Sequence, residues 1–173
     1  MPDEWGKTAL RRVLPHCLAL MAVGLILTAP LATALAAGPE TDFIAMYKGF
    51  FQDLQGKNYH LVWDAMTTAS KQEIAKQLAK AFVAAKRETT QAEAFNMLEK
   101  NTGNLRTKYL DNLHAELEKR SFFTGIVTAQ YAIKLSTNER VVVTITVSQE
   151  PKDFQILREA GKWKINFFYD LSH

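Results

Sequence analysis

The feature that most constrains the fold of this chain is a change in the spacing of its apolar residues near Phe122. Before that point apolar side chains recur every three or four residues, which is the period of an amphipathic helix. After it apolar and polar side chains alternate, which is the period of a half-buried strand. A chain with helices first and strands afterwards is expected to fold as an α+β domain with its helices packed against an antiparallel sheet.

Four or five helices are expected before the change in period. The first should span about residues 41–54, with an apolar stripe formed by Phe43, Met46, Phe50 and Leu54. Ser70 with Glu73, and Thr90 with Glu93, match the pattern of a capping box and predict the starts of two later helices. The last helix should carry apolar residues at intervals of four, namely Leu105, Tyr109, Leu113 and Leu117.

Four strands are expected after Phe122. The first should place five apolar residues on one face, namely Val127, Ala129, Tyr131, Ile133 and Leu135. Gly125, inside this pattern, is interpreted as a bulge or bend. Short turns at 137–139, 150–153 and 160–161 separate the strands, so we expect a four-stranded antiparallel meander.

The N-terminus has the three parts of a secretory signal peptide. Lys7, Arg11 and Arg12 precede an uncharged apolar stretch that begins at Val13, and small residues follow at 34–36. The basic end stays on the cytoplasmic side, the apolar helix enters the lipid, and the small residues fit the protease cleft. The pattern predicts cleavage after residue 36 and export, to the periplasm if the source is a Gram-negative bacterium.

Cleavage would divide the chain into a signal peptide, residues 1–36, and a single domain, residues 37–173. The alternative is an uncleaved membrane anchor, since residues 13–37 carry no formal charge. Lipid attachment at Cys17 is excluded because the apolar core follows this cysteine. Cys17 is the only cysteine, so the mature domain would hold neither a disulfide nor a thiol nucleophile.

Composition argues against several partners and cofactors. The net charge is +3 and no basic run exceeds two residues, so no nucleic-acid partner is expected. No glycine-rich phosphate motif is present, so no nucleotide cofactor is expected. A zinc site needs three or four convergent ligands. His114 with Glu118 offers at most half of one, and a solvated helix face explains the pair better, so no metal is expected.

Reactive side chains are most crowded in the stretch "NYHLVWDAMTTASK". The spacing of His60 and Asp64 places them on one helical face, where the carboxylate could orient the imidazole, with Ser70 or Thr67 as a nucleophile. A surface His–Asp pair shows the same spacing, and Ser70 is better explained as a helix cap. We therefore favour a structural role and assign no catalytic residue. An acid–base enzyme using His60, Asp64 or Asp170 stays as an alternative.

Two stretches resemble exported domains of the nuclear transport factor 2-like superfamily. The first is "FIAMYKGFFQDLQGKNYHLVWDAMTTASKQEI", with two helices around a glycine- and lysine-containing turn, and the second is "EAGKWKINFF", similar to the last strand of such domains. The resemblance implies helices that cap a curved sheet to form a cone. The tyrosine and aspartate of the ketosteroid-isomerase-like members have no matching positions here, so no catalytic residue is carried over.

Two non-catalytic functions fit this expected fold. In the first, the cone holds a small apolar or amphipathic ligand, because aromatic side chains can line a cavity beneath helices. The predicted lining residues are Trp63, Tyr131, Trp163 and Phe167. In the second, the domain associates with a second copy or with an envelope protein through an exposed sheet face or edge. Val142 and Phe168 would form the exposed patch.

Overall fold

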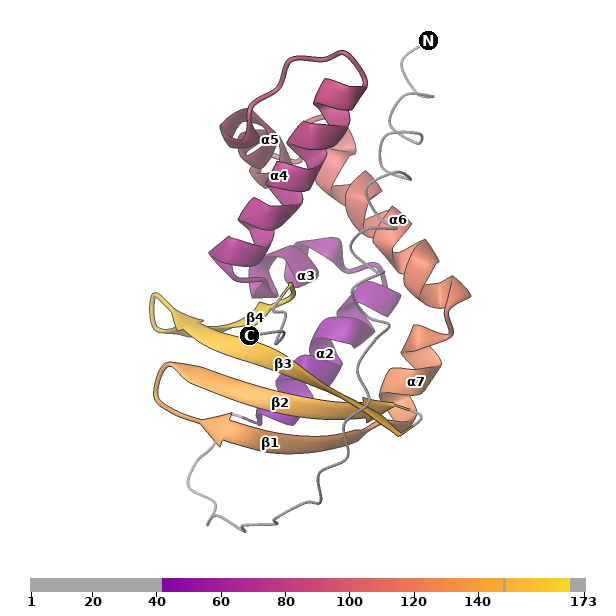
Figure 1. Ribbon diagram of the computed structural model, residues 1–173, viewed down its shortest axis with the longest axis vertical. Coiled ribbons are helices and arrows are strands. Elements are labelled where there is room, and N and C mark those ends of the chain that lie inside the picture. The colour runs from indigo at the N-terminus through magenta and orange to yellow at the C-terminus, as the bar shows by residue number, and fades with distance from the viewer. Residues whose placement is uncertain (1–41, 148, 169–173) are drawn as a thin grey trace.

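The computed structural model describes residues 42–147 and 149–168, in which all helices precede the strands (Figure 1). The predicted signal peptide lies outside the described residues. The helical elements are α2 (Phe43–Gln55), α3 (Tyr59–Ala65), α4 (Thr68–Ala84), α5 (Gln91–Glu99), the 3-10 turn η1 (Thr102–Asn104), α6 (Leu105–Lys119) and α7 (Phe122–Thr128). The strands are β1 (Gln130–Ser136), β2 (Arg140–Val147), β3 (Glu150–Glu159) and β4 (Lys162–Asn166). This order confirms the predicted α+β class.

The sheet is the predicted antiparallel meander. Its strands are hydrogen-bonded in chain order, β1–β2–β3–β4, and every neighbouring pair is antiparallel. The turn between β3 and β4 is formed by Ala160 and Gly161, whose φ angles are 48° and 79°. Two successive positive φ angles are typical of the two-residue hairpin turn whose twist matches the strands it joins.

The boundary between helices and strands lies later than the sequence predicted. Residues from Phe122 onward form α7, and the first strand begins only at Gln130. Phe123 and Ile126, three residues apart, are both buried on one side of α7. Gly125 is therefore a helical residue and not a bulge, and a Cβ atom there would lie 3.0 Å from Val147. Packing of α7 against β2 overrides the strand preference of its phenylalanine, threonine and valine residues.

The second turn was also predicted too late. Residues 150–153 are the start of β3, and Pro151 is paired with Thr146 of β2. Proline is tolerated close to the start of a strand, so Pro151 does not prevent this pairing.

The bulge of this sheet lies in β1 at Lys134. Ile133 is opposite Val143 and Leu135 is opposite Val142, so one residue of β1 has no partner in β2. A bulge shifts the alternation of side chains by one residue. Leu135 consequently leaves the face that Ile133 occupies, contrary to the single apolar face predicted for this strand.

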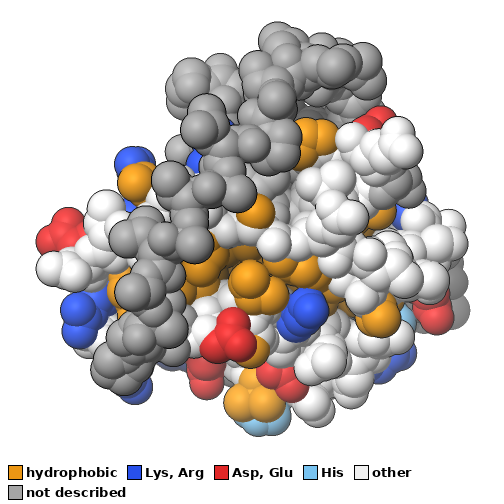
Figure 2. Space-filling model, turned by 90° about the horizontal axis from the view of Figure 1, so that it is seen from below, with side chains coloured by type: hydrophobic (Ala, Val, Ile, Leu, Met, Phe, Trp, Pro, Cys, Tyr) orange, Lys and Arg blue, Asp and Glu red, His pale blue; other side chains and the backbone are white. Residues whose placement is uncertain are grey.

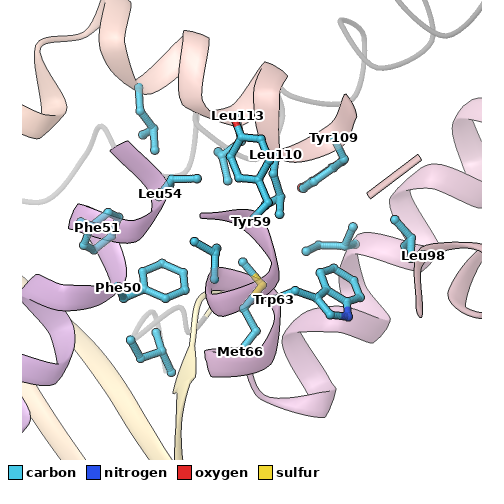
Figure 3. Packing of buried hydrophobic residues seen from close by; sticks show 14 of the residues in the cluster. Phe50, Phe51, Leu54, Tyr59, Trp63, Met66, Leu98, Tyr109, Leu110 and Leu113 are labelled. Carbon is cyan, nitrogen blue, oxygen red and sulfur yellow. The ribbon is translucent and has the colours of Figure 1, made fainter. Parts of the chain in front are cut away.

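The helices cover one face of the sheet and enclose the core (Figure 1). Val141, Val143 and Ile145 of β2 belong to this core and are buried. Figure 3 shows its helical part, to which α2, α3, α5 and α6 contribute. The labelled side chains are Phe50, Phe51, Leu54, Tyr59, Trp63, Met66, Leu98, Tyr109, Leu110 and Leu113.

Candidate functional site

The crowded stretch 58–71 holds the largest side chain of the core. Trp63 is fully buried, and its indole Nε1–H donates to a carboxylate oxygen of Glu99 at 3.2 Å. The cationic groups of Lys71 and Arg106 lie 5.2 and 5.7 Å from its ring centroid. Trp63 is thus held on several sides and joins α3 to α4, α5 and α6.

Ser70 neither caps α4 nor is free to act as a nucleophile. The N-cap is Thr67, whose hydroxyl accepts from the Ser70 N–H at 3.2 Å, so the predicted capping box of Ser70 with Glu73 is wrong. Ser70 Oγ donates to Asn166 Oδ1 (3.1 Å) and accepts from the Phe167 N–H (2.8 Å) and the Thr67 hydroxyl (2.9 Å). A buried hydroxyl with its donor and both acceptor positions in use is a structural group.

The connection from α3 to α4 closes the β4 edge of the sheet. Met66 forms an isolated parallel bridge with Ile165, and the Thr67 N–H donates to the Ile165 carbonyl at 2.9 Å. The carboxylate of Glu159, at the end of β3, accepts from the N–H of Thr68 (3.0 Å) and from its hydroxyl (3.0 Å). An edge that would otherwise present unpaired backbone groups is therefore partly paired within the chain.

His60 and Asp64 do not form a catalytic pair in this structure. Both are exposed on α3, and among the described residues no hydrogen bond or ion pair joins them. The backbone carbonyl of Asp64 accepts a hydrogen bond from Lys164 of β4. Asp170, the other predicted acid–base residue, lies outside the described residues.

His114 is a packed residue of α6. Its ring lies 5.2 Å from the Phe123 ring centroid, and its Nδ1 is 3.9 Å from a carboxylate oxygen of Glu118. Across residues 42–147 and 149–168, no three acidic, histidine or cysteine side chains come together as a metal site would require.

Two of the predicted ligand-lining residues lie at opposite corners of the sheet. Tyr131 of β1 shares a row with Ile145 and Lys152, whereas Trp163 of β4 is paired with Arg158. Lys152 and Arg158 are six residues apart on β3, or about 20 Å along the strand. The structure therefore does not bring Tyr131 and Trp163 to one site.

The other predicted lining residues pack against helices. The Trp163 ring meets Phe43 of α2 edge-on at 4.9 Å, and the Phe167 ring lies 5.8 Å from Phe50 of the same helix. Trp63 is held among α4, α5 and α6. Trp163, Phe167 and Tyr131 thus each neighbour α2, Tyr131 through Lys48, while Trp63 lies elsewhere in the core.

A buried tyrosine that the sequence analysis overlooked directly precedes Lys48 on α2, and the amine of Lys48 lies over the Tyr131 ring. Tyr47 of α2 is 0% exposed, and its ring is 5.2 Å from Phe51 and 5.1 Å from Phe154. Its hydroxyl has no hydrogen-bond partner among the described residues. Burial, and to a smaller extent Tyr131, raise the pKa of Tyr47 well above its ordinary value. A buried hydroxyl without a partner is uncommon in folded proteins and marks a point where another polar group would be favourable.

Tyr131 has a hydrogen-bond partner and a cationic neighbour of its own. Its hydroxyl donates to the Ile126 carbonyl at 2.6 Å, and Lys48 Nζ lies 4.7 Å from its ring centroid. The pKa of Tyr131 is raised by burial. Sequence could have pointed to Tyr47, because it lies four residues after Phe43 and three before Phe50 on the apolar stripe.

The β1 edge is open along the described chain. β1 is paired with β2 on one side, and no other described segment is paired with it. Ile133 on this strand is 45% exposed, and Val127, near the end of α7, is 72% exposed. The charge of Lys134 at the bulge is compensated, because its amine is 2.6 Å from the carboxylate of Asp153 on β3.

Figure 2 views the molecule from the β1 side and shows hydrophobic side chains gathered across the middle of that face. The patch predicted from Val142 and Phe168 is not what provides them. Val142 lies on the face away from the helices, as predicted, but it is only 6% exposed, and Phe168 is partly buried against Phe167. Among the described residues, Ile133 on β1 and Val127 on α7 are the exposed large hydrophobic side chains of these two elements.

Comparison of the chain with protein-family models, with curated proteins and with solved structures found no match. Within the residues that the structure describes, no helix has the length and apolar character needed to cross a membrane.

Proposed function

We propose that this chain is an exported, non-catalytic association domain that binds a second copy of itself through the β1 edge. The observation that carries the proposal is the difference between the two edges of the sheet. The β4 edge is paired with the α3–α4 connection, whereas β1 is open on its outer side in the described chain. Open strand edges present backbone donors and acceptors to a further strand.

A second copy suits this edge because antiparallel pairing of two identical strands is self-complementary about a twofold axis. Residues 130–133, before the bulge, carry no charge, so two copies would meet without like charges opposed. Lys134, the one charged residue of β1, is paired with Asp153. Exposed Ile133 would gain burial on pairing.

Sedimentation equilibrium of the wild type and two matched variants tests self-association. We expect a dimer for the wild type, a monomer for Ile133→Lys, and a dimer for Leu61→Lys. Leu61 on α3 is 44% exposed, almost the same as Ile133, and lies away from β1. A monomeric wild type would contradict the proposal and favour docking on another envelope protein. Equal dissociation of both variants would show that the interface is not the β1 edge.

The export part of the proposal is supported by the basic, apolar and small-residue pattern of residues 1–36. N-terminal sequencing of the protein from fractionated cells should find a chain that begins at Ala37 outside the cytoplasm. An intact Met1 on a membrane-bound chain would contradict cleavage. Membership of the nuclear transport factor 2-like superfamily stays a proposal that the helices-then-meander order supports.

A second candidate function is the binding of a small amphipathic ligand beside Tyr47 and Tyr131. The unpartnered hydroxyl of Tyr47 favours it, because a ligand acceptor there would satisfy a buried donor. Native mass spectrometry of the purified protein should then detect an added mass that Tyr47→Phe loses. If no mass is bound, Tyr47→Phe should keep or raise the free energy of unfolding, by up to about 1 kcal/mol, since it removes an unsatisfied buried group.

A further inference from the structure

The far end of α4 projects away from the sheet. Thr67 and Ser70 fix the start of this helix against β4 and the residues after it. The 17 residues of α4 span about 25 Å. Figure 1 shows the end of α4 and the connection to α5 at the opposite end of the molecule from β1. This end of the molecule, residues 76–91, is called the α4–α5 tip below.

The α4–α5 tip is positively charged. Residues 76–91 contain four basic residues, Lys76, Lys80, Lys86 and Arg87, and one acidic residue, Glu88. Lys76 is paired with Glu73 at 3.0 Å, but Lys80 and Lys86 have no ion pair within the described residues. Further along, Glu93 is engaged with the Thr90 N–H in the α5 capping box. Lys80, Lys86 and Arg87 are thus available to an anionic partner.

An exposed aliphatic side chain lies among these cations. Val83 is 59% exposed, and it lines a shallow, open hollow with Lys76, Lys80 and Thr89. The floor of the hollow is apolar, being formed largely by alanine and valine side chains. The hollow is open, so it would contact a side chain of a protein partner on one side only. Cations spread around a small apolar patch on a projecting end are instead suited to a lipid headgroup layer.

We propose that the α4–α5 tip binds the surface of an anionic phospholipid membrane. Lys80, Lys86 and Arg87 contact the headgroups, and Val83 enters the boundary between headgroups and acyl chains. Charge complementarity argues for this occupant, because polybasic segments are attracted to anionic lipid within about one Debye length of the surface. The proposal is independent of the β1 edge, which lies at the other end of the molecule.

Lys86 offers a test in which stability and binding move in opposite directions. It is in the left-handed conformation, with φ 59°, directly after Ala85, the C-cap residue of α4. The Lys86 N–H donates to the Val83 carbonyl and the Arg87 N–H to the Phe82 carbonyl, both at 2.9 Å. A left-handed conformation at this position favours glycine, which has no Cβ atom. Lys86→Gly should therefore stabilise the fold while it removes one cation from the tip.

The experiment places a reporter at the tip itself, so that the N-terminal segment cannot supply the signal. Full-length protein carrying Cys17→Ser and Val83→Cys is labelled at position 83 with an environment-sensitive fluorophore. It is titrated with vesicles of phosphatidylcholine and phosphatidylglycerol, or of phosphatidylcholine alone. We expect a blue shift with the anionic vesicles only, and its loss at about 0.5 M salt, where the Debye length falls well below 10 Å.

Two double charge-reversal variants then distinguish binding by the α4–α5 tip from attraction that depends only on the net charge of the protein. Lys80→Glu/Lys86→Glu should weaken vesicle binding by at least about tenfold. Arg120→Glu/Lys162→Glu changes the net charge equally at exposed sites near the sheet, and should change binding less than about twofold. Lys86→Gly should weaken binding although its melting temperature rises.

Three results would overturn the proposal: no response of the reporter to anionic vesicles, equal loss of binding in the two reversal pairs, or unchanged binding in Lys86→Gly. A reporter response to polyglutamate but not to vesicles would identify the tip as a surface for acidic polypeptides, and the membrane proposal would then be wrong.

Discussion

The two outer strands of the sheet differ in what borders them. β4 is bordered by the α3–α4 connection, through the backbone of Thr67 and the side chains of Ser70 and Glu159. β1 is bordered by β2 alone in the described chain, and its exposed residues include the apolar Ile133. The contrast teaches that hydroxyl groups can be concentrated in one stretch because their hydrogen bonds close a sheet edge, and not because they are catalytic. The open edge, which has few reactive groups, is then the better candidate for function.

The largest effect is expected where the closed edge is joined to the core. Trp63→Ala should lower the free energy of unfolding by about 3–5 kcal/mol, because it removes a fully buried indole and leaves a cavity. Ile133→Ala on the open edge should cost about 1 kcal/mol or less, since its side chain is already half exposed. Urea melts of both variants give the comparison, and similar losses would show that the two edges do not differ in burial.

The next largest effect is expected in a comparison of two serines, Ser70 beside the closed β4 edge and Ser136 on the open β1 edge. Ser70→Ala should cost about 1–3 kcal/mol, because it leaves the Phe167 N–H and the side-chain Oδ1 of Asn166 without their partner at a partly buried place. Ser136→Ala, at the exposed end of β1, should change stability by less than about 0.5 kcal/mol.

Thermal or urea unfolding of the two serine variants measures this difference. A Ser70→Ala protein as stable as the wild type would mean that the network around Ser70 does not hold the edge closed. A Ser136→Ala protein that loses as much stability would remove the contrast between the edges.

Local patterns in the sequence were sufficient for the order of the elements. Spacing of three and four, followed by alternation, predicted helices before a meander, and the structure confirms both. The capping box of Thr90 with Glu93 is also confirmed, because the Glu93 N–H donates to the Thr90 hydroxyl and the Thr90 N–H donates to the Glu93 carboxylate. Such patterns succeed where the partners are three or four residues apart.

Contacts between distant residues could not be predicted in the same way. Ser70 and Glu73 match the capping pattern, yet the Ser70 hydroxyl forms hydrogen bonds with Asn166 and Phe167, which lie 96 and 97 positions later in the chain. Alternation placed Tyr131 and Trp163 on the same face of the sheet, but their separation depends on register and strand order. Predicting whether the four aromatic residues line one site therefore required the register and order of the strands, which local patterns do not give.

A smaller effect is expected from the carboxylate that bridges β3 to α4. Glu159→Gln should cost about 0.5–1 kcal/mol, because a charged acceptor at the first turn of a helix becomes neutral while its shape is kept. Glu139→Gln, in the turn between β1 and β2, removes an exposed carboxylate at the same end of β2 and β3, and should be close to neutral because the backbone carbonyl of Glu139, which accepts from the Arg158 N–H, is kept. Equal losses in urea melts would show that general charge, and not the contact with Thr68, explains the effect.

The smallest effect is expected at the two exposed residues that first suggested catalysis beside the closed edge. The double variant His60→Asn/Asp64→Asn should change the free energy of unfolding by no more than about 0.5 kcal/mol, the usual size for an exposed pair on one helix. The contact of Asp64 with β4 uses its backbone carbonyl, which accepts from Lys164, so this contact survives the substitution. Self-association, measured by sedimentation equilibrium, should also be unchanged, because neither side chain lies on β1. A variant that keeps its stability and its dimer but loses a ligand or a turnover found in the wild type would show that the pair is functional, and the structural interpretation of this stretch would be wrong.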